Sequence, residues 1–353
     1  MNIMSSLKIA TWNAEWMAYM FSGSQNNFLK KNSKEKIPDV DAWAKRKADY
    51  IKSINPDILG IQEGPKTEDQ MNSFVQKYLS DSEGNPFYDV YRNADGPVPK
   101  SIYDRQYLYL LVKRKHNFQV KNLKNNPKVK EILYEYWPVY YWGSVKEKRH
   151  RFWRRPLVTE INIEGKKLKI IIVHTKSLLL KRSKKWAKEH PQEFTKEAMK
   201  SRIKLATEAW KIRQYMDYCF EKQSDVPIIL MGDLNDGPGR RYFEKHFFFQ
   251  DMIDVIIGTL MSPEKFMKHA FADYDERERY TSEFSDWLNP NISDKLLLDH
   301  ILLSPSFFDS DSELVLEKNS AIIDHQKYDD HFDDDEKKDR PSDHRVASVH
   351  IRY

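Results

Sequence analysis

The chain has 353 residues, of which 40% are hydrophobic and 31% are charged, and its formal net charge is +5. No run approaches the roughly 20 apolar residues of a transmembrane helix, so a membrane-spanning protein is excluded and no stable membrane association is expected. Cys219 is the single cysteine, which excludes an internal disulfide and argues against a secreted, disulfide-stapled scaffold. The N-terminus lacks the pattern of a signal peptide, and we therefore expect a cytoplasmic protein.

Short apolar or alternating segments predict β-strands along the whole chain, and the 3.6-residue periodicity of apolar side chains predicts three helices between them. In chain order the predicted elements are a strand at 8–12, a helix at 39–54, a strand at 57–61, a helix at 66–79, strands at 107–112, 157–163 and 168–173, a helix at 195–221, and strands at 227–231, 296–303 and 346–351. Gly165 and Lys166 lie between two of these strands and predict a hairpin. Many strands with few helices favour two packed sheets with helices outside them over a strictly alternating βα fold.

No linker or internal repeat divides the chain, and its length suits one large domain. We therefore expect a single catalytic domain over residues 1–353, a monomer, with surface insertions at about 113–130, 266–289 and 324–341. Residues 329–339 (DDHFDDDEKKD) are a charge run typical of a solvated loop, although His331 and its neighbouring aspartates leave a second cation site open.

Charge is unevenly distributed along the chain. Residues 309–339 contain twelve acidic residues and four lysines, a local balance of −8, so the rest of the chain carries +13. Two basic clusters, 146–155 (KEKRHRFWRR) and 176–188 (KSLLLKRSKKWAK), interleave aromatic with basic side chains. That pattern is typical of a surface that contacts phosphates and stacks bases, although lysine-rich solvated faces are also common on globular proteins.

Polar side chains that can carry chemistry lie at or near the ends of the predicted strands. They are Asn13, Glu63, His174, Asp233, Asn235, Asp299, Asp343 and His344. Side chains at strand ends can meet at one edge of a rigid sandwich, as active sites often do.

The types of these residues fit one chemistry. Glu63, Asp343 and Asn13 offer hard oxygen ligands, suited to Mg²⁺, or Mn²⁺ as a substitute, rather than to zinc. Asp233 could orient or deprotonate a water that attacks a phosphate, and Asn235 could hydrogen-bond both. The two histidines supply proton transfer near neutral pH.

Each of these residues also has a structural alternative. The segment 232–237 (GDLNDG) is by itself typical of a turn, because Gly, Asp and Asn are the commonest turn formers. Asp343 could cap a helix or form an Asx-turn, and His174 could be a partly buried structural histidine. Their joint occurrence at strand ends favours the functional interpretation.

Seven segments, taken in order, resemble the motif series of the endonuclease/exonuclease/phosphatase superfamily, and in particular its deoxyribonuclease I-like branch. They are TWN (11–13), IQE (61–63), FWRRP (152–156), VHTKS (173–177), GDLND (232–236), LLLDHILLS (296–304) and SDH (342–344). The resemblance spans residues 9–351. It implies a four-layered α/β sandwich, with two central mixed sheets flanked by helices, and a metal-dependent phosphoesterase.

The resemblance also implies a role for each matching residue. Glu63 corresponds to the principal metal-binding glutamate, with Asn13 and Asp343 as its companions. Asp233 and Asn235 correspond to the pair that positions the attacking water and contacts the scissile phosphate. The remaining positions are the catalytic histidine His344, its orienting carboxylate Asp299, the second histidine His174 of the deoxyribonuclease-like branch, and the phosphate-contacting arginine, Arg154 or Arg155.

The chain departs from that branch just before the predicted strand at 107–112. A glutamate that orients the second histidine is expected there, whereas the local sequence is Asp104-Arg105-Gln106. The partner of His174 is therefore undetermined, and Asp104 is the nearest acid in sequence.

Three functions remain under consideration. We expect an endonuclease that hydrolyses DNA, because both histidines are present and the basic, aromatic-containing clusters adjoin Arg154 and His174. A lipid or inositol-phosphate phosphoesterase is the alternative, for which residues 134–142 (YEYWPVYYW) could form a lipid-facing loop. A catalytically silent binding module is the least favoured, because every acidic and histidine position of the main motifs is filled.

Overall fold

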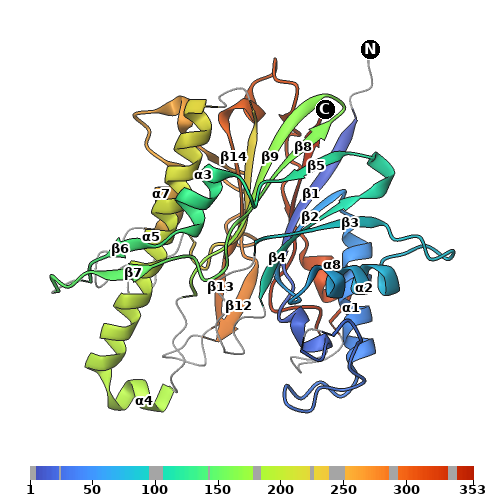
Figure 1. Ribbon diagram of the computed structural model, residues 1–353, viewed down its shortest axis with the longest axis horizontal. Coiled ribbons are helices and arrows are strands. Elements are labelled where there is room, and N and C mark those ends of the chain that lie inside the picture. Colours follow the sequence, from blue (N-terminus) through green and yellow to red (C-terminus); the bar gives the residue numbers. More distant parts are fainter. Residues whose placement is uncertain are drawn as a thin grey trace.

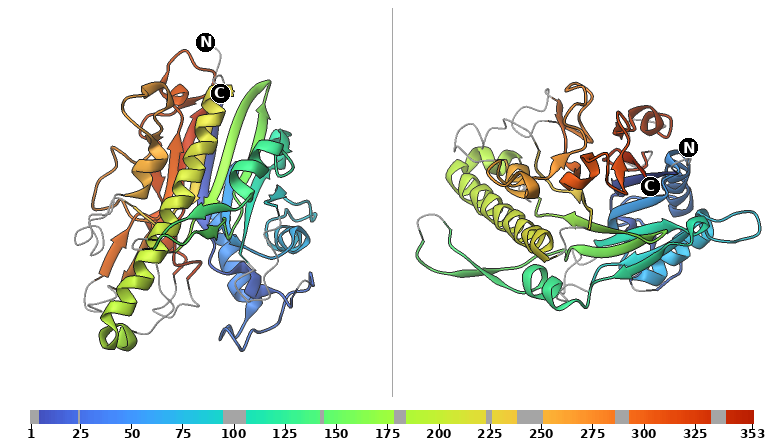
Figure 2. Two further views of the ribbon diagram at one scale, coloured as in Figure 1. Left: turned by 60° about the vertical axis from the view of Figure 1, so that its left-hand side comes forward. Right: turned by 90° about the horizontal axis from the view of Figure 1, so that it is seen from above.

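Two large β-sheets pack against each other and carry helices on their outer sides (Figures 1 and 2). The computed structural model describes residues 5–23, 25–94, 106–141, 144–177, 184–222, 226–237, 251–285, 293–332 and 340–353. The four-layered α/β sandwich expected from the sequence is confirmed.

The first sheet has seven strands in the order β15-β17-β1-β2-β4-β3, with β16 beside β17. It is mixed, because β1 runs parallel to β2 and antiparallel to β17. Its strands are β1 (Ser6–Asn13), β2 (Ile58–Gly64), β3 (Tyr88–Arg92), β4 (Tyr107–Lys113), β15 (Val315–Leu316), β16 (Ile322–Ile323) and β17 (Ala347–Arg352). The helices that accompany it are α1 (Val40–Ile54), α2 (Glu68–Tyr78) and α8 (His325–Asp329).

The second sheet has six strands in the order β11-β14-β10-β9-β8-β5. It is mixed as well, since β9 and β10 are parallel while β8 and β14 run antiparallel to them. Its strands are β5 (Gln119–Asn122), β8 (Leu157–Ile163), β9 (Lys166–His174), β10 (Ile228–Asp233), β11 (Lys268–His269) and β14 (Asp299–Leu303). The helices that accompany it are α3 (Pro127–Val129), α5 (Pro191–Lys222) and α7 (Met252–Ile257), and the short α4 (Lys184–Glu189) precedes α5.

Alternation along the strands divides the apolar residues among three cores, because successive side chains point to opposite faces of a sheet. In β1, Leu7 and Ile9 pack between the two sheets, whereas Trp12 packs against the first set of helices. In β9, Ile172 packs between the sheets and Val173 packs towards α5. Each sheet is thus buried on both faces, and polar strand ends are left at its edges.

Local sequence explains where the main helices begin and end. The Asp39 side chain accepts a hydrogen bond from the Ala42 N–H and caps α1, and Asn55 ends that helix in the left-handed conformation. Thr67 and Gln70 form a reciprocal capping box at the start of α2. All three predicted helices are present, with bounds that differ by a few residues from those expected.

The strand expected at 296–303 is not continuous, and this prediction is wrong. The chain forms β13 (Ser293–Leu296), which pairs with β12 (Ser282–Ser285) in a separate hairpin, and then β14 in the second sheet. The Thr281 hydroxyl accepts hydrogen bonds from the N–H groups of Leu298 and Asp299 at the break. The largely apolar segment 296–303 gives no local sign of such a change of partner.

Other predicted segments have definite positions. Glu164 and Gly165 have positive φ and form the tight turn of the β8–β9 hairpin, which confirms the expected turn. The segment 113–130 contains β5, an edge strand of the second sheet. Part of the acidic run, 333–339, and part of the second basic cluster, 178–183, lie outside the described residues.

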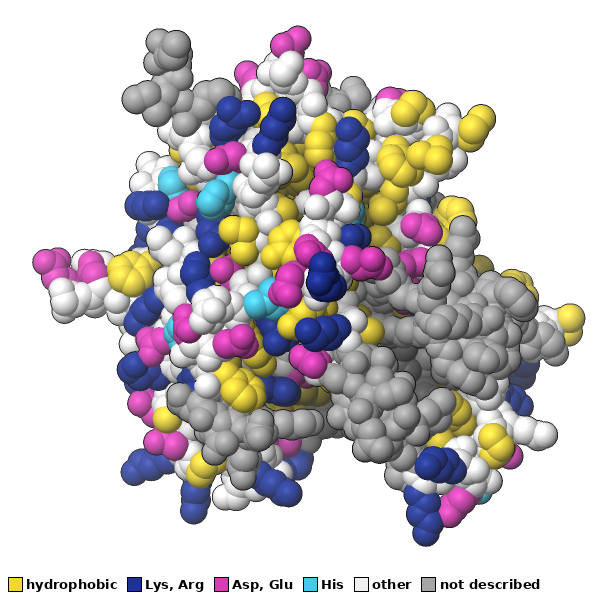
Figure 3. All heavy atoms as spheres, turned by 180° about the vertical axis from the view of Figure 1, so that it is seen from behind, with side chains coloured by type: hydrophobic (Ala, Val, Ile, Leu, Met, Phe, Trp, Pro, Cys, Tyr) yellow, Lys and Arg dark blue, Asp and Glu magenta, His cyan; other side chains and the backbone are white. Residues whose placement is uncertain are grey.

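A second two-stranded hairpin, β6 (Trp137–Val139) and β7 (Lys148–His150), lies alongside the long helix α5, to one side of the sheets (Figure 1). Seen from behind, basic and acidic side chains intermingle over the described surface (Figure 3). No helix in the described part of the chain is long and apolar enough to cross a membrane.

Candidate active site

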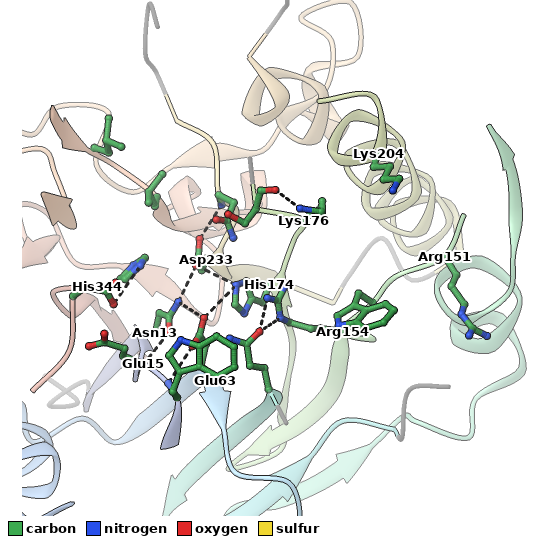
Figure 4. A pocket seen from close by; sticks show the side chains of 18 of the residues that line it. Asn13, Glu15, Glu63, Arg151, Arg154, His174, Lys176, Lys204, Asp233 and His344 are labelled. Atoms are coloured by element: carbon green, nitrogen blue, oxygen red, sulfur yellow. Dashed lines mark hydrogen bonds and ion pairs between the residues drawn. The ribbon is translucent and has the colours of Figure 1, made fainter. Parts of the chain in front are cut away.

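The two parallel strand pairs end at the same edge of the sandwich, and their last residues meet there. Asn13 ends β1 and Glu63 lies near the end of β2, while His174 and Asp233 are register partners at the ends of β9 and β10. A cavity of about 830 Å³ opens over this edge (Figure 4). Eight of the nine predicted site residues line it: Asn13, Glu63, Arg154, His174, Asp233, Asn235, Asp343 and His344. Asp299 is fully buried and hydrogen-bonded to His344.

Glu63 lies at an irregularity in the β2–β4 pairing and has a positive φ of 58°. The Trp16 N–H donates to its Oε2 at 3.0 Å, which orients the carboxylate toward the cavity. Burial raises the pKa of Glu63 to about 7, with Asp343 and Asp233 adding to the rise and Arg154 opposing it. A carboxylate in these surroundings is stabilised by a nearby cation.

Asn13 connects the carboxylates. Its Nδ2 donates to Asp233 Oδ2 at 2.9 Å and lies 3.5 Å from Glu63 Oε1, while its Oδ1 accepts from the Glu15 N–H at 3.1 Å. The amide nitrogen, rather than the oxygen that a metal ligand would present, therefore faces the acidic groups in this structure.

Asp233 lies between Asn13 and His174. Its Oδ1 accepts from the Asn235 N–H at 2.8 Å, and its Oδ2 is 3.3 Å from His174 Nε2. Burial raises the pKa of Asp233 to about 6, with His344 opposing the rise. Burial and the charges of Arg154 and His344 lower the pKa of His174 well below its ordinary value, so this imidazole is neutral.

Gly232 determines the path of the chain into this loop. Its φ is +139°, and a Cβ at this position would lie 2.0 Å from the Val173 carbonyl oxygen. Asn235 also has a positive φ, of 49°, and its Nδ2 donates to the Thr175 carbonyl at 3.2 Å. Glycine permits β9 and β10 to approach closely enough for His174 and Asp233 to meet.

His344 is in the opposite protonation state to His174. Its Nδ1 lies 2.6 Å from Asp299 Oδ2, and its Nε2 lies 3.9 Å from Asp343 Oδ1. Burial disfavours the charged form, but Asp299, Asp343 and Asp233 outweigh it and raise the pKa of His344 well above the ordinary value. The site thus holds one neutral and one charged histidine.

Arg154 lines the cavity, with its guanidinium held by Gln106 and by the Thr175 carbonyl. Nε donates to Gln106 Oε1 at 2.9 Å and Nη1 to Thr175 O at 3.2 Å. The Arg155 guanidinium instead lies over the ring of Tyr134, at 4.9 Å, and Arg155 is not among the residues that line the cavity.

The acidic partner expected to orient His174 from the segment before β4 is not found among the described residues. The buried Nδ1 of His174 has no hydrogen-bond partner among the described residues, and Asp104 lies outside them. Gln106, which the sequence offered only as a departure from the family pattern, is used to hold Arg154.

Two buried charged residues near the site were not recognised from the sequence. Lys47 on α1 donates to the carbonyls of Ala14 and Pro341, at 2.7 and 2.5 Å, and so joins the loops that carry Asn13 and His344. Glu208 on α5 accepts from the Lys176 N–H at 2.7 Å. Each lies within the apolar face of its helix. A charged residue at such a position was the signal in the sequence that could have indicated a buried role.

The donor set fits a magnesium ion. Mg²⁺ commonly takes only one or two protein carboxylates, and water and substrate phosphate oxygens complete its shell. Among the residues that the structure describes, no three His, Cys, Asp or Glu side chains form a complete metal-binding cluster, as a structural zinc would require. Glu63 and Asp343 are the residues that could hold the ion, and Asn13 could join them if its amide were reversed.

Solved structures of low sequence identity resemble this chain along nearly its whole length. A solved endonuclease/exonuclease/phosphatase from Bacteroides vulgatus matches with a TM-score of 0.50 at 13% identity, over 98% of both chains. D. rerio TDP2, solved with a single-strand DNA product, has a TM-score of 0.49 at 14% identity over 99% of this chain and 100% of its own. The human Nocturnin catalytic domain has a TM-score of 0.47 at 14% identity over 99% and 97%.

A comparison with curated protein sequences gives no significant match. The family profile of the Endonuclease/Exonuclease/phosphatase family, in contrast, matches residues 10–344. This match covers all seven motif segments and nearly the whole chain. The chain belongs to the endonuclease/exonuclease/phosphatase family.

Proposed function

We propose that this phosphoesterase is a Mg²⁺-dependent nuclease that hydrolyses phosphodiester bonds in DNA, with Mn²⁺ as a possible substitute. The observation that carries the proposal is the arrangement of two histidines around Asp233: His174 Nε2 lies 3.3 Å from Asp233 Oδ2, His344 is held by Asp299 on the other side (Figure 4), and the pKa values of the two histidines shift in opposite directions. Groups whose surroundings separate their pKa values in this way are suited to act as base and acid in one reaction.

The residues divide the reaction between them. Asp233, whose pKa is about 6, accepts the proton of a water as the water oxygen attacks phosphorus, and the neutral His174, 3.3 Å away, orients the Asp233 carboxylate. The P–O bond to the leaving sugar oxygen then breaks, and the His344 imidazolium, oriented by Asp299, donates a proton toward the charge that develops. Arg154 and Asn235 contact the phosphate oxygens. A bound magnesium ion would neutralise phosphate charge.

Glu63→Gln and His344→Ala should each abolish cleavage of supercoiled plasmid DNA in Mg²⁺, and EDTA should abolish wild-type cleavage. Glu264→Gln, in an exposed 3-10 turn (Pro263–Lys265), is the matched control and should cleave normally. Circular dichroism verifies that each variant is folded. Wild-type cleavage by either site variant would refute the proposal.

One observation favours the alternative of a lipid or inositol-phosphate substrate. Tyr140 and Val145, in the loop between β6 and β7, are 55% and 99% exposed and could contact a lipid surface. The substrate panel should therefore include sphingomyelin and an inositol polyphosphate beside duplex DNA, single-stranded DNA and RNA. Product from a lipid or inositol substrate, with no nucleic acid cleaved, would establish the alternative.

A further inference from the structure

The cavity is divided by charge along its length. The carboxylates, His174 and His344 lie at one end, and cationic side chains extend from Arg154 beside them to the other end (Figure 4). The cationic end is lined by Arg149, Arg151, Arg154, Lys176 and Lys204. Two exposed aromatic residues, Tyr136 and Trp153, line the same end, with 52% and 43% of their surface accessible. A substrate bound at the acidic end can therefore extend along a basic and aromatic wall.

This wall is formed by the β6–β7 hairpin and the residues next to it, in which successive side chains point to opposite faces. Trp137 pairs with His150 in the hairpin register, which places Tyr136 beside Arg151, just beyond the strand ends. The Arg151 guanidinium lies over the Tyr136 ring, 4.3 Å from its centroid. Trp137 is buried and makes edge contacts with His150 and Phe152, at 5.2 and 5.3 Å between ring centroids. The inner face thus anchors the hairpin, and the outer face offers flat rings and guanidinium groups.

Glu208 fixes the hairpin relative to the catalytic edge. The residue is 1% exposed; its Oε1 lies 3.0 Å from His150 Nε2, and its Oε2 accepts from the Lys176 N–H at 2.7 Å. Lys176 follows His174 by two residues. The wall and the site are therefore connected through one buried carboxylate, and the binding surface is formed before a substrate arrives.

We infer that the nucleic acid next to the scissile phosphate is unpaired and that its bases stack on Trp153 and Tyr136; this inference rests on the proposed function. Trp153 directly precedes Arg154, so a phosphate at Arg154 brings the adjoining base to the indole. A ring can stack on the face of a base only when that base is not already stacked within a duplex, so exposed rings beside cationic side chains favour an unpaired strand.

The position of the rings favours a nucleic acid over a membrane at this end of the cavity. Tyr136 and Trp153 line a concave surface and are interleaved with arginines, which a base and its phosphate can enter. Tyr140 and Val145 are exposed on the same hairpin but do not line the cavity. A lipid surface would contact those two residues first.

The experiment compares cleavage of a single-stranded oligonucleotide with that of the same sequence as a duplex. Wild-type protein should prefer the single strand. Trp153→Ala and Tyr136→Leu should each lower kcat/KM on the single strand by about 5- to 150-fold, the range for loss of one base–aromatic stack. Tyr140→Leu is the matched control from the same hairpin and should retain the wild-type value.

A modified substrate distinguishes the loss of base stacking from a nonspecific effect of the substitutions on the site. Replacing the bases that flank the scissile bond by abasic residues should slow wild-type protein by a similar factor, and Trp153→Ala should then lose little more. Binding of the labelled single strand in EDTA, followed by fluorescence anisotropy, should weaken in parallel. Urea unfolding midpoints verify that the exposed substitutions leave the fold intact.

The possible failures are distinguishable. If wild-type protein cuts DNA but Trp153→Ala and Tyr136→Leu cut the single strand normally, or if the duplex is preferred, the stacking inference is wrong and the proposed function stands. If wild-type protein cuts no nucleic acid, hydrolyses phospholipid, and loses binding to anionic vesicles on Tyr140→Leu, both are wrong.

Discussion

Gly232 begins the loop that carries Asp233 and Asn235, in a conformation that other residues rarely adopt. Gly232→Ala should lower the free energy of unfolding by about 2–5 kcal/mol, because it combines a positive φ with a clash against the Val173 carbonyl. Gly23→Ala is the control, since Gly23 also has positive φ (63°) but no atom within 4 Å of the added carbon, and should cost about 1–2 kcal/mol. Urea denaturation measures both. Equal losses would show that the close approach of β9 and β10 is unimportant.

His344 owes its protonation to Asp299, and this gives a pH dependence with a definite sign. A histidine whose pKa is raised by folding contributes stability that is complete below the unfolded pKa of about 6.5 and is lost as pH rises through the folded pKa. Asp299→Asn should therefore destabilise the protein most in acid and progressively less in alkali. It should also lower the pKa of His344 in an NMR titration and reduce kcat by about 10²- to 10⁴-fold.

The control for that prediction is Asp309→Asn, an exposed residue that follows a short 3-10 helix (Pro305–Phe308). It should leave the titration and the rate unchanged. If the pKa of His344 were unchanged in Asp299→Asn, Asp299 would not be the residue that keeps His344 protonated.

Helix α1 takes part in the site through Lys47, although it lies behind the first sheet. Burial lowers the pKa of Lys47 to about 8, yet its ammonium donates to two loop carbonyls and lies 4.3 Å from the Trp43 ring centroid. Lys47→Met should lower the free energy of unfolding by about 2–4 kcal/mol, because two buried carbonyls lose their donor.

Lys45→Met on the exposed side of α1 is the matched control, since its ion pair with Asp49 is largely solvated. Its effect should stay within about 0.5 kcal/mol. Under conditions where both proteins are folded, Lys47→Met should also be less active than the wild-type protein. Full activity would mean that α1 does not position the loops of Asn13 and His344.

The helices and strands themselves were largely predictable from the sequence, but the pairing of strands within the sheets was not. The helix at 39–54 and the β8–β9 hairpin follow from caps, turn residues and periodicity, which are local properties. The division of 296–303 between two sheets depends on hydrogen bonds that the Thr281 hydroxyl accepts, and the placement of β5 depends on its pairing with β8. No local pattern contains that information.

In the site, too, local patterns were predictable from the sequence and long-range contacts were not. The site residues at strand ends could be found because each motif is a short stretch of consecutive residues. Eight of the nine residues predicted in this way line one cavity. The functions of Lys47, Glu208 and Gln106 could not, because each depends on contacts with residues far away in sequence. The orientation of the Asn13 amide likewise depends on the Glu15 backbone.

The two sheets together create a buried acidic site, and a cation should stabilise the entire fold. At about pH 8, above the pKa of about 7 of Glu63, Mg²⁺ should raise the free energy of unfolding, by about 2.7 kcal/mol at a concentration 100 times its dissociation constant. The increase should shrink below that pKa, where protons compete. Thermal unfolding across a Mg²⁺ series measures it, and an equal increase in Glu63→Gln would place the ion elsewhere.

Strands β1 and β17, at opposite ends of the described chain, pair with each other from Ser6 with Arg352 to Thr11 with Ala347. The Trp12 indole donates to the His344 carbonyl at 3.0 Å, and Ser342 donates to the Asn13 carbonyl. The Trp12–His344 contact joins residues 332 positions apart, so this part of the fold requires a long loop to close and should form slowly. Until β17 pairs with β1, His344 is not held near Asn13, and the residues of the site come together only when that pairing forms.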